Sequence, residues 1–247
     1  MPGLQSFSEA PITLFSVAKD TFVRLRLHRA LGWLEAPLLR AAMVLAFSRW
    51  RDAHRNLPIH LREGGTFDER RFRFYDEIYV RERLDGPLDY LEFGVAAGES
   101  FRWWVGRNRD PRSRFIGFDT FTGLPEDWGR FRRGHFDTAG IPPDIGDPRC
   151  RFVSGLFAET LPRFVAEYDP GPRRVVHVDC DLYGSALTVL TGFAGHLRPG
   201  DLVLFDEFSA LAHEFRAWTD FLSARPMPHR VVGEANDYAQ VALVIRD

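Results

Sequence analysis

Residues Leu91 to Ser100 read Leu-Glu-Phe-Gly-Val-Ala-Ala-Gly-Glu-Ser, a short apolar run followed by two glycines four positions apart. The run predicts a β-strand that ends at Phe93, and the glycines predict a tight turn that opens a helix. Gly94 and Gly98 would let the backbone come close to a ligand, where a Cβ would collide. The first amides of a helix lack partners within the helix and can bind a carboxylate. The segment therefore predicts a ligand-binding strand–turn–helix unit, with a plain tight turn as the alternative.

The same turn departs from the glycine pattern of dinucleotide-binding proteins. That pattern is G-x-G-x-x-G, and here Ala96 and Glu99 occupy its second and third glycine positions. A pyrophosphate is therefore disfavoured as the ligand, and the carboxylate of an amino acid fits better. A nucleotide-dependent oxidoreductase stays as the less favoured alternative.

Outward from this unit, strands and helices alternate along the chain. Helices are expected at residues 100–106, 159–168 and 185–197, and a hairpin of residues 230–233 and 240–245 closes the chain. This alternation predicts a doubly wound α/β fold, in which helices cover both faces of a mostly parallel sheet. With the hairpin, the sheet has seven strands. The five expected parallel strands are residues 88–93, 114–118, 151–153, 175–178 and 202–205.

The strand after the glycine turn ends in Gly117-Phe-Asp119. A carboxylate at this place can accept hydrogen bonds from both hydroxyls of a ribose. Because Asp119 lies one strand–helix unit after the glycine turn, we favour that role over a helix cap or turn residue. The long segment 120–148 follows, rich in Gly, Pro, Asp and Arg but also in aromatic residues, and we expect it to be a lid.

Residues 1–65 are expected to form a helical extension, and residues 66–247 the α/β domain. Thr66-Phe-Asp-Glu69 has the form of a capping box and predicts the start of a helix that runs to about Arg83. The most apolar early run, Ala36 to Phe47, contains Arg40 and is too short to span a bilayer. We therefore expect a packing helix and no transmembrane segment. Peripheral membrane contact stays open, as does a homo-oligomer formed through the N-terminal helices.

Composition disfavours some partners and compartments. The formal net charge is −2, whereas nucleic-acid binders show a basic surplus, so we expect no nucleic-acid partner. Cys150 and Cys180 lack the spacing of a metal or redox pair, and the N-terminus lacks a signal-peptide pattern. We therefore expect a cytoplasmic protein.

Three stretches together resemble one family. They are Tyr90–Ser100, then Phe118-Asp-Thr-Phe-Thr-Gly-Leu-Pro125, and then His177-Val-Asp-Cys-Asp-Leu-Tyr-Gly-Ser185 with Gly200-Asp-Leu-Val-Leu-Phe-Asp-Glu-Phe208. Over residues 85–215 the chain resembles the macrocin O-methyltransferase family. Its members methylate sugar hydroxyls of natural products with S-adenosylmethionine (SAM) and a divalent metal. The resemblance implies a Rossmann-like class I methyltransferase domain at residues 66–247 and leaves the N-terminal third unexplained.

The resemblance also implies roles for single residues. The cofactor-binding residues would be Glu92, Gly94, Gly98 and Ser100 for the methionine part of SAM, and Asp119 for the ribose. The metal-binding and catalytic residues would be Asp179, Asp206 and Glu207. The family often has aspartate where this chain has Glu207, whose side chain is longer by one methylene.

The residue types favour a metal on their own. Asp179 and Asp206 each follow a strand of one parallel sheet, and such strand ends face the same crevice. Clustered carboxylates repel one another unless they are protonated or bridged by a cation. Oxygen ligands favour Mg²⁺, with Mn²⁺ also possible. The alternative is that these acids hydrogen-bond backbone amides or substrate hydroxyls without metal.

The proton of the acceptor hydroxyl needs a destination. Metal-dependent catechol methyltransferases have a similar layout with a lysine three residues after the first metal aspartate, where this chain has Leu182. Lys19 is the single lysine of the chain, so a carboxylate, His135, His213 or a metal-bound water must take the proton. We expect a SAM-dependent O-methyltransferase, assisted by Mg²⁺, whose acceptor is a sugar or another small natural product. A metal-independent small-molecule methyltransferase and a catalytically silent scaffold with this fold are the alternatives.

Overall fold

The computed structural model describes residues 14–247. Residues 1–13 of the expected helical extension lie outside the described residues. By their internal contacts the residues form two compact units, which divide between Ala42 and Met43. This division falls inside a helix, earlier than the expected boundary at residue 65, because Met43 and later side chains of that helix pack against the core of the second unit.

The described part of the first unit is helical. It contains α1 (Leu14–Arg24), α2 (His28–Leu31), a 3₁₀ turn (Gly32–Leu34) and the start of α3 (Glu35–Ala53). Among the described residues, the helical run His28–Ala53 has the length and composition needed to cross a membrane. The run is 26 residues long, so its length alone does not exclude a span, whereas Ala36–Phe47 by itself is too short.

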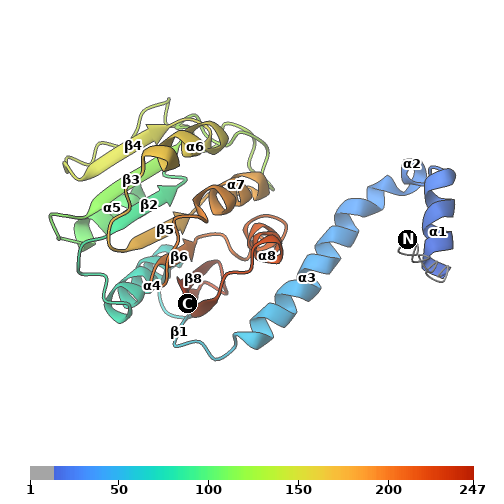
Figure 1. The fold of residues 1–247 in the computed structure, drawn as a ribbon, viewed down its shortest axis with the longest axis horizontal. Helices are drawn as coiled ribbons and strands as arrows, with labels where there is room; N and C mark the ends of the chain where they lie inside the picture. The colour runs from blue at the N-terminus through green and yellow to red at the C-terminus, as the bar shows by residue number, and fades with distance from the viewer. Residues whose placement is uncertain (1–13) are drawn as a thin grey trace, which may run out of the picture. The chain divides into compact units, whose positions relative to one another are not determined.

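The second unit is built on one sheet with the strand order β1-β7-β8-β6-β5-β2-β3-β4 (Figure 1). The parallel part, β4-β3-β2-β5-β6, and the antiparallel hairpin β7–β8 confirm the predicted doubly wound class I methyltransferase arrangement. The strands are β1 (Ile59–Leu61), β2 (Asp89–Phe93), β3 (Arg114–Asp119), β4 (Cys150–Ser154), β5 (Arg174–Val178), β6 (Leu202–Phe205), β7 (His229–Ala235) and β8 (Gln240–Ile245).

The eighth strand, β1, adds to the seven that the sequence predicts. It pairs parallel to β7 at the edge of the sheet. The two backbones approach closely, since a Cβ on Gly233 would lie 2.5 Å from Cβ of Ile59. The neighbouring Glu234 carboxylate fixes the pairing by accepting hydrogen bonds from His60 at 2.9 Å and Arg62 at 2.6 Å. Three residues with a histidine in the middle give no strand pattern, so this element was not predicted.

Two helical layers enclose the sheet because its strands are apolar on both faces (Figure 1). One layer contains α4 (Phe67–Arg81) and α5 (Glu99–Arg107), which pack on side chains such as Tyr90 and Phe115. The other contains α6 (Phe157–Glu167), α7 (Tyr183–Phe193) and α8 (Glu214–Ala224).

Helix α4 begins with the predicted capping box. The amide of Glu69 donates to the Thr66 hydroxyl at 3.2 Å, and the Glu69 carboxylate accepts the Thr66 amide at 2.6 Å. This start sets the rotation of the helix, which buries Tyr75 and leaves the guanidinium of Arg71 facing the strand ends.

Candidate active site

A cavity of about 940 Å³ opens at the carboxyl ends of the parallel strands. Residues that follow all five parallel strands, β2 to β6, contribute to its wall, as ligand sites in open α/β sheets do. The wall contains seven of the eight predicted site residues: Gly94, Gly98, Ser100, Asp119, Asp179, Asp206 and Glu207.

The glycine turn depends on backbone contacts that a side chain would block. Gly94 has φ +95°, and a Cβ there would collide with the carbonyl oxygen of Asp179. Gly98 has φ +79° and caps the start of α5, where a Cβ would lie 2.8 Å from Pro143. Gly94 therefore makes room for the loop after β5, in addition to any approach to a ligand.

Asp119 at the end of β3 holds the glycine turn. Its Oδ2 accepts the amides of Val95 at 2.7 Å and Ala96 at 2.8 Å, and its Oδ1 accepts the amide of Phe121 at 2.7 Å. Each carboxylate oxygen can accept more than one hydrogen bond, so these contacts leave capacity for ribose hydroxyls. Asp119 thus has a structural role that its place in the sequence did not reveal.

Glu92 is predicted to contact the cofactor directly, but its side chain has other partners in the structure. Within residues 14–247 it is fully buried and lies outside the cavity wall. Ser100 donates a hydrogen bond to its Oε1 at 2.6 Å, and the Tyr90 hydroxyl donates to its Oε2. Burial raises the pKa of Glu92. The acid therefore supports the cavity through Ser100, which does line it.

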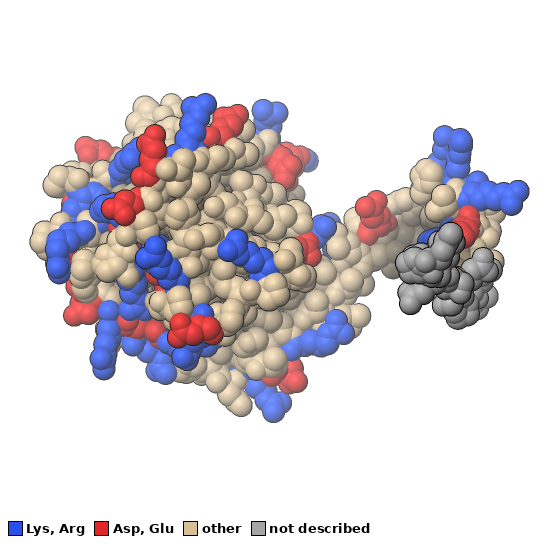
Figure 2. All heavy atoms as spheres, viewed as in Figure 1, with Lys and Arg blue, Asp and Glu red and all other residues tan. Residues whose placement is uncertain are grey.

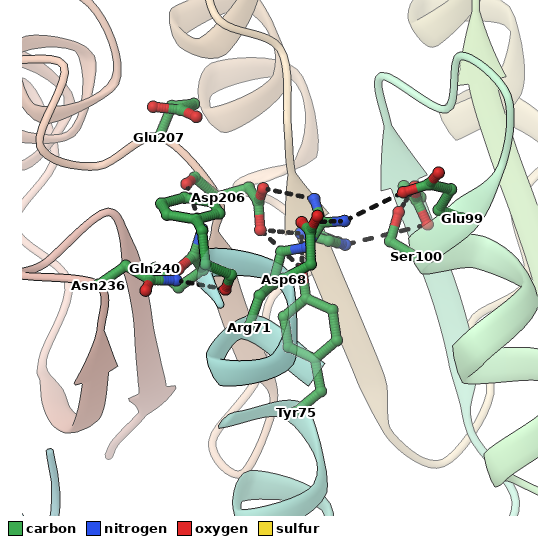
Figure 3. Close-up of polar contacts among 12 residues, drawn as sticks. Asp68, Arg71, Tyr75, Glu99, Ser100, Asp206, Glu207, Asn236 and Gln240 are labelled. Carbon is green, nitrogen blue, oxygen red and sulfur yellow. Dashed lines mark hydrogen bonds and ion pairs between the residues drawn. The ribbon is translucent and has the colours of Figure 1, made fainter. Parts of the chain in front are cut away.

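Asp206 after β6 is anchored from below by helix α4 (Figure 3). Its Oδ1 accepts the Tyr75 hydroxyl at 2.6 Å, and its Oδ2 lies 3.4 Å from Nη1 of Arg71. Burial opposes ionisation, but His177, Arg71 and Tyr75 hold the pKa of Asp206 below its ordinary value. Among the acids of the cavity, Asp206 therefore has the strongest tendency to ionise.

The other acids of the cavity have the opposite tendency. Burial, together with the charges of neighbouring acids, raises the pKa of Asp179 well above its ordinary value. The same two causes raise the pKa of Asp181 and of Glu207 to about 7. In Figure 3, Glu207 stands apart from the contacts that join Asp206, Tyr75 and Arg71. Within the described residues, the cavity wall therefore contains more carboxylates than its two arginines, Arg71 and Arg130, can neutralise.

Three residues that contact the predicted site residues or their loops lie in parts of the sequence that no motif marks. Arg71 and Tyr75 lie on α4, outside the motifs, and Arg71 also contacts Glu99 at 3.3 Å. In the described chain, Nε of Arg71 is buried without a hydrogen-bond partner. Glu214 at the start of α8 accepts the amides of Cys180 at 3.2 Å and Glu207 at 3.1 Å. It thereby ties the loops after β5 and β6 together.

The segment 120–148 covers part of the cavity through Leu124, Trp128, Phe131 and neighbouring residues. It is folded on itself, because the Leu124 amide donates to the His135 carbonyl and the Leu124 carbonyl accepts the Gly134 amide, both at 2.9 Å. The rings of Trp128 and Phe131 stack at 5.3 Å. Neither His135 nor His213, the two histidines considered as proton acceptors, is among the described residues that line the cavity.

The metal site proposed from the sequence is not preformed. In the described part of the chain, no three His, Cys, Asp or Glu side chains are grouped as ligands of one ion. The donor chemistry nevertheless fits a hard divalent cation, because burial and the charge of Asp206 raise the pKa of Asp179, Asp181 and Glu207, and a bound cation would relieve that repulsion.

Comparisons with known proteins agree with this geometry. The model of a family described as "Methyltransferase domain" matches residues 91–208, which contain both the glycine turn and the acids after β5 and β6. No match to the chain is found among curated proteins.

Solved structures include similar proteins. CalS11, a calicheamicin methyltransferase, is 27% identical with a TM-score of 0.56, and the alignment covers 70% of this chain and 77% of that one. An apo structure of CalS11, described as TDP-rhamnose 3'-O-methyltransferase, is 28% identical with a TM-score of 0.51 over 70% and 78% of the two chains. The O-methyltransferase NovP, 20% identical with a TM-score of 0.53 over 72% and 78%, shares the fold. The strand order, the glycine turn and these matches together identify the chain as a class I SAM-dependent methyltransferase.

Proposed function

We propose that this methyltransferase transfers the methyl group of SAM to a hydroxyl of a sugar or a related small molecule, assisted by a divalent metal. The observation that carries the proposal is the convergence of the glycine turn and the acids Asp179, Asp181, Asp206 and Glu207 on one cavity. A cofactor-binding turn beside a cluster of carboxylates suits a reaction that must activate a hydroxyl. The description of CalS11 as a TDP-rhamnose 3'-O-methyltransferase supports the choice of acceptor.

SAM would be held at both ends by groups already in place. The amides at the start of α5 face the methionine carboxylate, and Ser100 is fixed there by Glu92. Asp119 would accept the ribose hydroxyls while it holds the amides of Val95 and Ala96. The cofactor brings an activated methyl on a sulfonium, so the chain contributes mainly alignment.

The reaction breaks the bond between sulfur and the methyl carbon and leaves its electron pair on sulfur. The acceptor oxygen forms the new bond to carbon and loses its proton. Asp181 and Asp179 line the cavity and can take that proton, whereas the chain has no lysine near them in sequence. Aromatic side chains of segment 120–148, such as Trp128 and Phe131, would exclude water from the reacting atoms.

Asp179 and Asp206 would hold the metal, with Glu207 as a further ligand or as support. A bound Mg²⁺ would lower the pKa of the acceptor hydroxyl and orient it. To complete the ligand set, the carboxylates must gather more closely than they do around Arg71. We further propose a cytoplasmic location, which the two free cysteines, Cys150 and Cys180, support.

A screen of sugar and phenolic acceptors with labelled SAM, run with Mg²⁺ and with EDTA, tests this function. Methylation of a sugar hydroxyl that needs the metal is the expected result. Activity that is equal in chelated enzyme would favour a metal-independent methyltransferase. SAM binding without transfer to any acceptor in the screen would favour the scaffold.

A further inference from the structure

The second unit described above contains the proposed active site, and we call it the catalytic unit. The helices that precede it expose an apolar surface. We define the N-terminal helical segment as residues 14–45, from α1 into α3. Its large apolar side chains are mostly in solvent, with Phe15 exposed at 78%, Trp33 at 70% and Leu38 at 64%. Val17, Phe22, Val23, Leu25, Leu31, Val44 and Leu45 are also exposed. The surfaces of soluble proteins rarely expose so many large apolar side chains together. We therefore expect this segment to contact a membrane or another protein.

The apolar groups of α3 surround the helix instead of forming one stripe. Residues in a helix are separated by about 100°, so Leu38, Leu39 and Val44 point in three different directions, each about 100–140° from the next. Leu38 and Val44 are exposed, and Leu39 is partly exposed. A helix that docks on a second protein chain shows a single apolar stripe with a polar opposite face. A helix with apolar side chains around its circumference is better suited to contact with lipid than to packing against a helix of another protein.

The charge of the segment also fits a lipid surface. Residues 14–45 contain the basic side chains Lys19, Arg24, Arg26, Arg29 and Arg40, and the acidic side chains Asp20 and Glu35. Their net charge is +3 in a chain whose total is −2. In Figure 2, basic side chains lie over the α1 and α2 end of this unit, and the surface of α3 next to it is largely uncharged. Basic clusters beside apolar side chains are typical of segments that bind anionic membranes.

The length of the segment favours a position along the membrane surface. From Met43 onward side chains of α3 pack against the core of the catalytic unit, so about 13 residues lie between Arg29 and Met43. As a helix they would reach about 20 Å, which is less than the hydrocarbon thickness of about 30 Å. They also contain Glu35 and Arg40, which are costly at the centre of a bilayer. Trp33 suits the interface between water and acyl chains.

We propose that the N-terminal helical segment attaches the enzyme to the surface of membranes that contain anionic lipid. Its apolar side chains enter the boundary between headgroups and acyl chains, and its arginines contact the lipid phosphates. This attachment is independent of the acceptor proposed for the active site.

Vesicle flotation with the full-length protein tests the attachment. Vesicles of phosphatidylcholine alone are compared with vesicles that also contain phosphatidylglycerol. The protein should bind the anionic vesicles at least tenfold more tightly, and added salt should weaken the binding. Leu38→Glu should lower it at least tenfold, whereas Val80→Glu, at a residue of α4 with 63% exposure, should change it less than twofold.

The contribution of charge is tested with a second pair of variants. Arg24→Glu with Arg29→Glu should lower binding to anionic vesicles at least tenfold. Arg163→Glu with Arg225→Glu changes the net charge equally at exposed positions of the catalytic unit, and it should have less than a twofold effect. SAM binding by every variant shows that the catalytic unit is folded.

Four results would overturn the proposal. They are absence of binding to both kinds of vesicle, equal losses in test and control variants, and retention in the membrane after alkaline carbonate, which indicates a spanning helix. The fourth is a dimer in light scattering that Leu38→Glu dissociates while vesicles leave the wild-type protein unbound. That result would assign the surface to a second copy of the chain.

Discussion

The hydroxyl of Tyr75 donates a hydrogen bond of 2.6 Å to Oδ1 of Asp206, so a helix outside the family motifs fixes the acid that follows β6. The same hydroxyl lies 3.5 Å from Nε2 of His177, whose Nδ1 is 2.7 Å from the hydroxyl of Tyr90. Tyr90 in turn donates to Glu92. A continuous series of buried polar side chains therefore connects Glu92, on the proposed cofactor side, to Asp206, on the proposed acceptor side.

Tyr75→Phe should lower kcat about tenfold or more, because partners that orient a catalytic carboxylate typically have effects of this size. The affinity for SAM should change little, since Tyr75 does not line the cavity. Steady-state kinetics and calorimetry measure the two quantities. Tyr79→Phe, one turn further along α4, is the matched control and should keep its kcat. A fall in both variants would indicate general disturbance of the helix.

Asp119→Ala should weaken SAM binding by about 1–3 kcal/mol, because it removes a charged acceptor of two ribose hydrogen bonds and of the Val95 and Ala96 amides. Titration calorimetry with SAM and with its demethylated product gives the affinities. Asp144→Ala, at an exposed position of the long loop, should leave both affinities unchanged. Wild-type affinity in Asp119→Ala would remove the ribose assignment.

Chelation should abolish turnover and spare SAM binding, because the contacts proposed for the cofactor lie at the ends of β2 and β3 while the metal acids follow β5 and β6. Mg²⁺ should restore activity. Asp179→Asn and Asp206→Asn should each lower kcat by about a hundredfold or more, since each removes a charge with little change of shape. Glu207→Gln should be milder. Full activity in thoroughly chelated enzyme would contradict the metal role and leave the aspartates as general bases.

Segment 120–148 should become protected from proteolysis when SAM and acceptor are both bound, because its aromatic side chains face the cavity. Trp128→Ala should raise KM for the acceptor severalfold by removing a wall of the site and its stack on Phe131. Cleavage within this segment can be followed over time by mass spectrometry. Cleavage at the same rate with and without ligands would count against closure.

Glu214→Gln should destabilise the fold by about 1–3 kcal/mol, because an amide can replace one of the two carboxylate oxygens that accept the Cys180 and Glu207 amides. The other amide would be left buried without an acceptor. Thermal unfolding measures the loss, and Asp220→Asn on the same helix is the control. An unchanged Tm in Glu214→Gln would show that the two loops are held by other contacts.

The sequence predicted the strands and their ends well because those signals are local. The runs at residues 202–205 and 240–245 coincide with β6 and β8, and the capping box at Thr66 forms as expected. Arg71, Tyr75 and Glu214 could not be predicted in the same way. They reach the acids through the tertiary packing of α4 and α8, and a single arginine or tyrosine on a helix has no pattern that marks it.

Glu92 shows a different limit of prediction from sequence. Its place in the motif predicts a cofactor contact, yet nothing in the motif reveals that Tyr90 and Ser100 occupy both of its oxygens. Likewise, the short strand β1 follows from the missing side chain of Gly233, which lies far away in sequence. Contacts between distant segments determine both outcomes.

The contact between Gly94 and the Asp179 carbonyl has a consequence for engineering new specificities. Because a side chain at position 94 would collide with that carbonyl, the turn proposed to bind the cofactor and the loop that carries Asp179 must keep their close packing together. A graft that replaces one loop with that of a related enzyme should therefore bring the other loop with it. Exchange of the acceptor loop alone would alter the cofactor pocket as well.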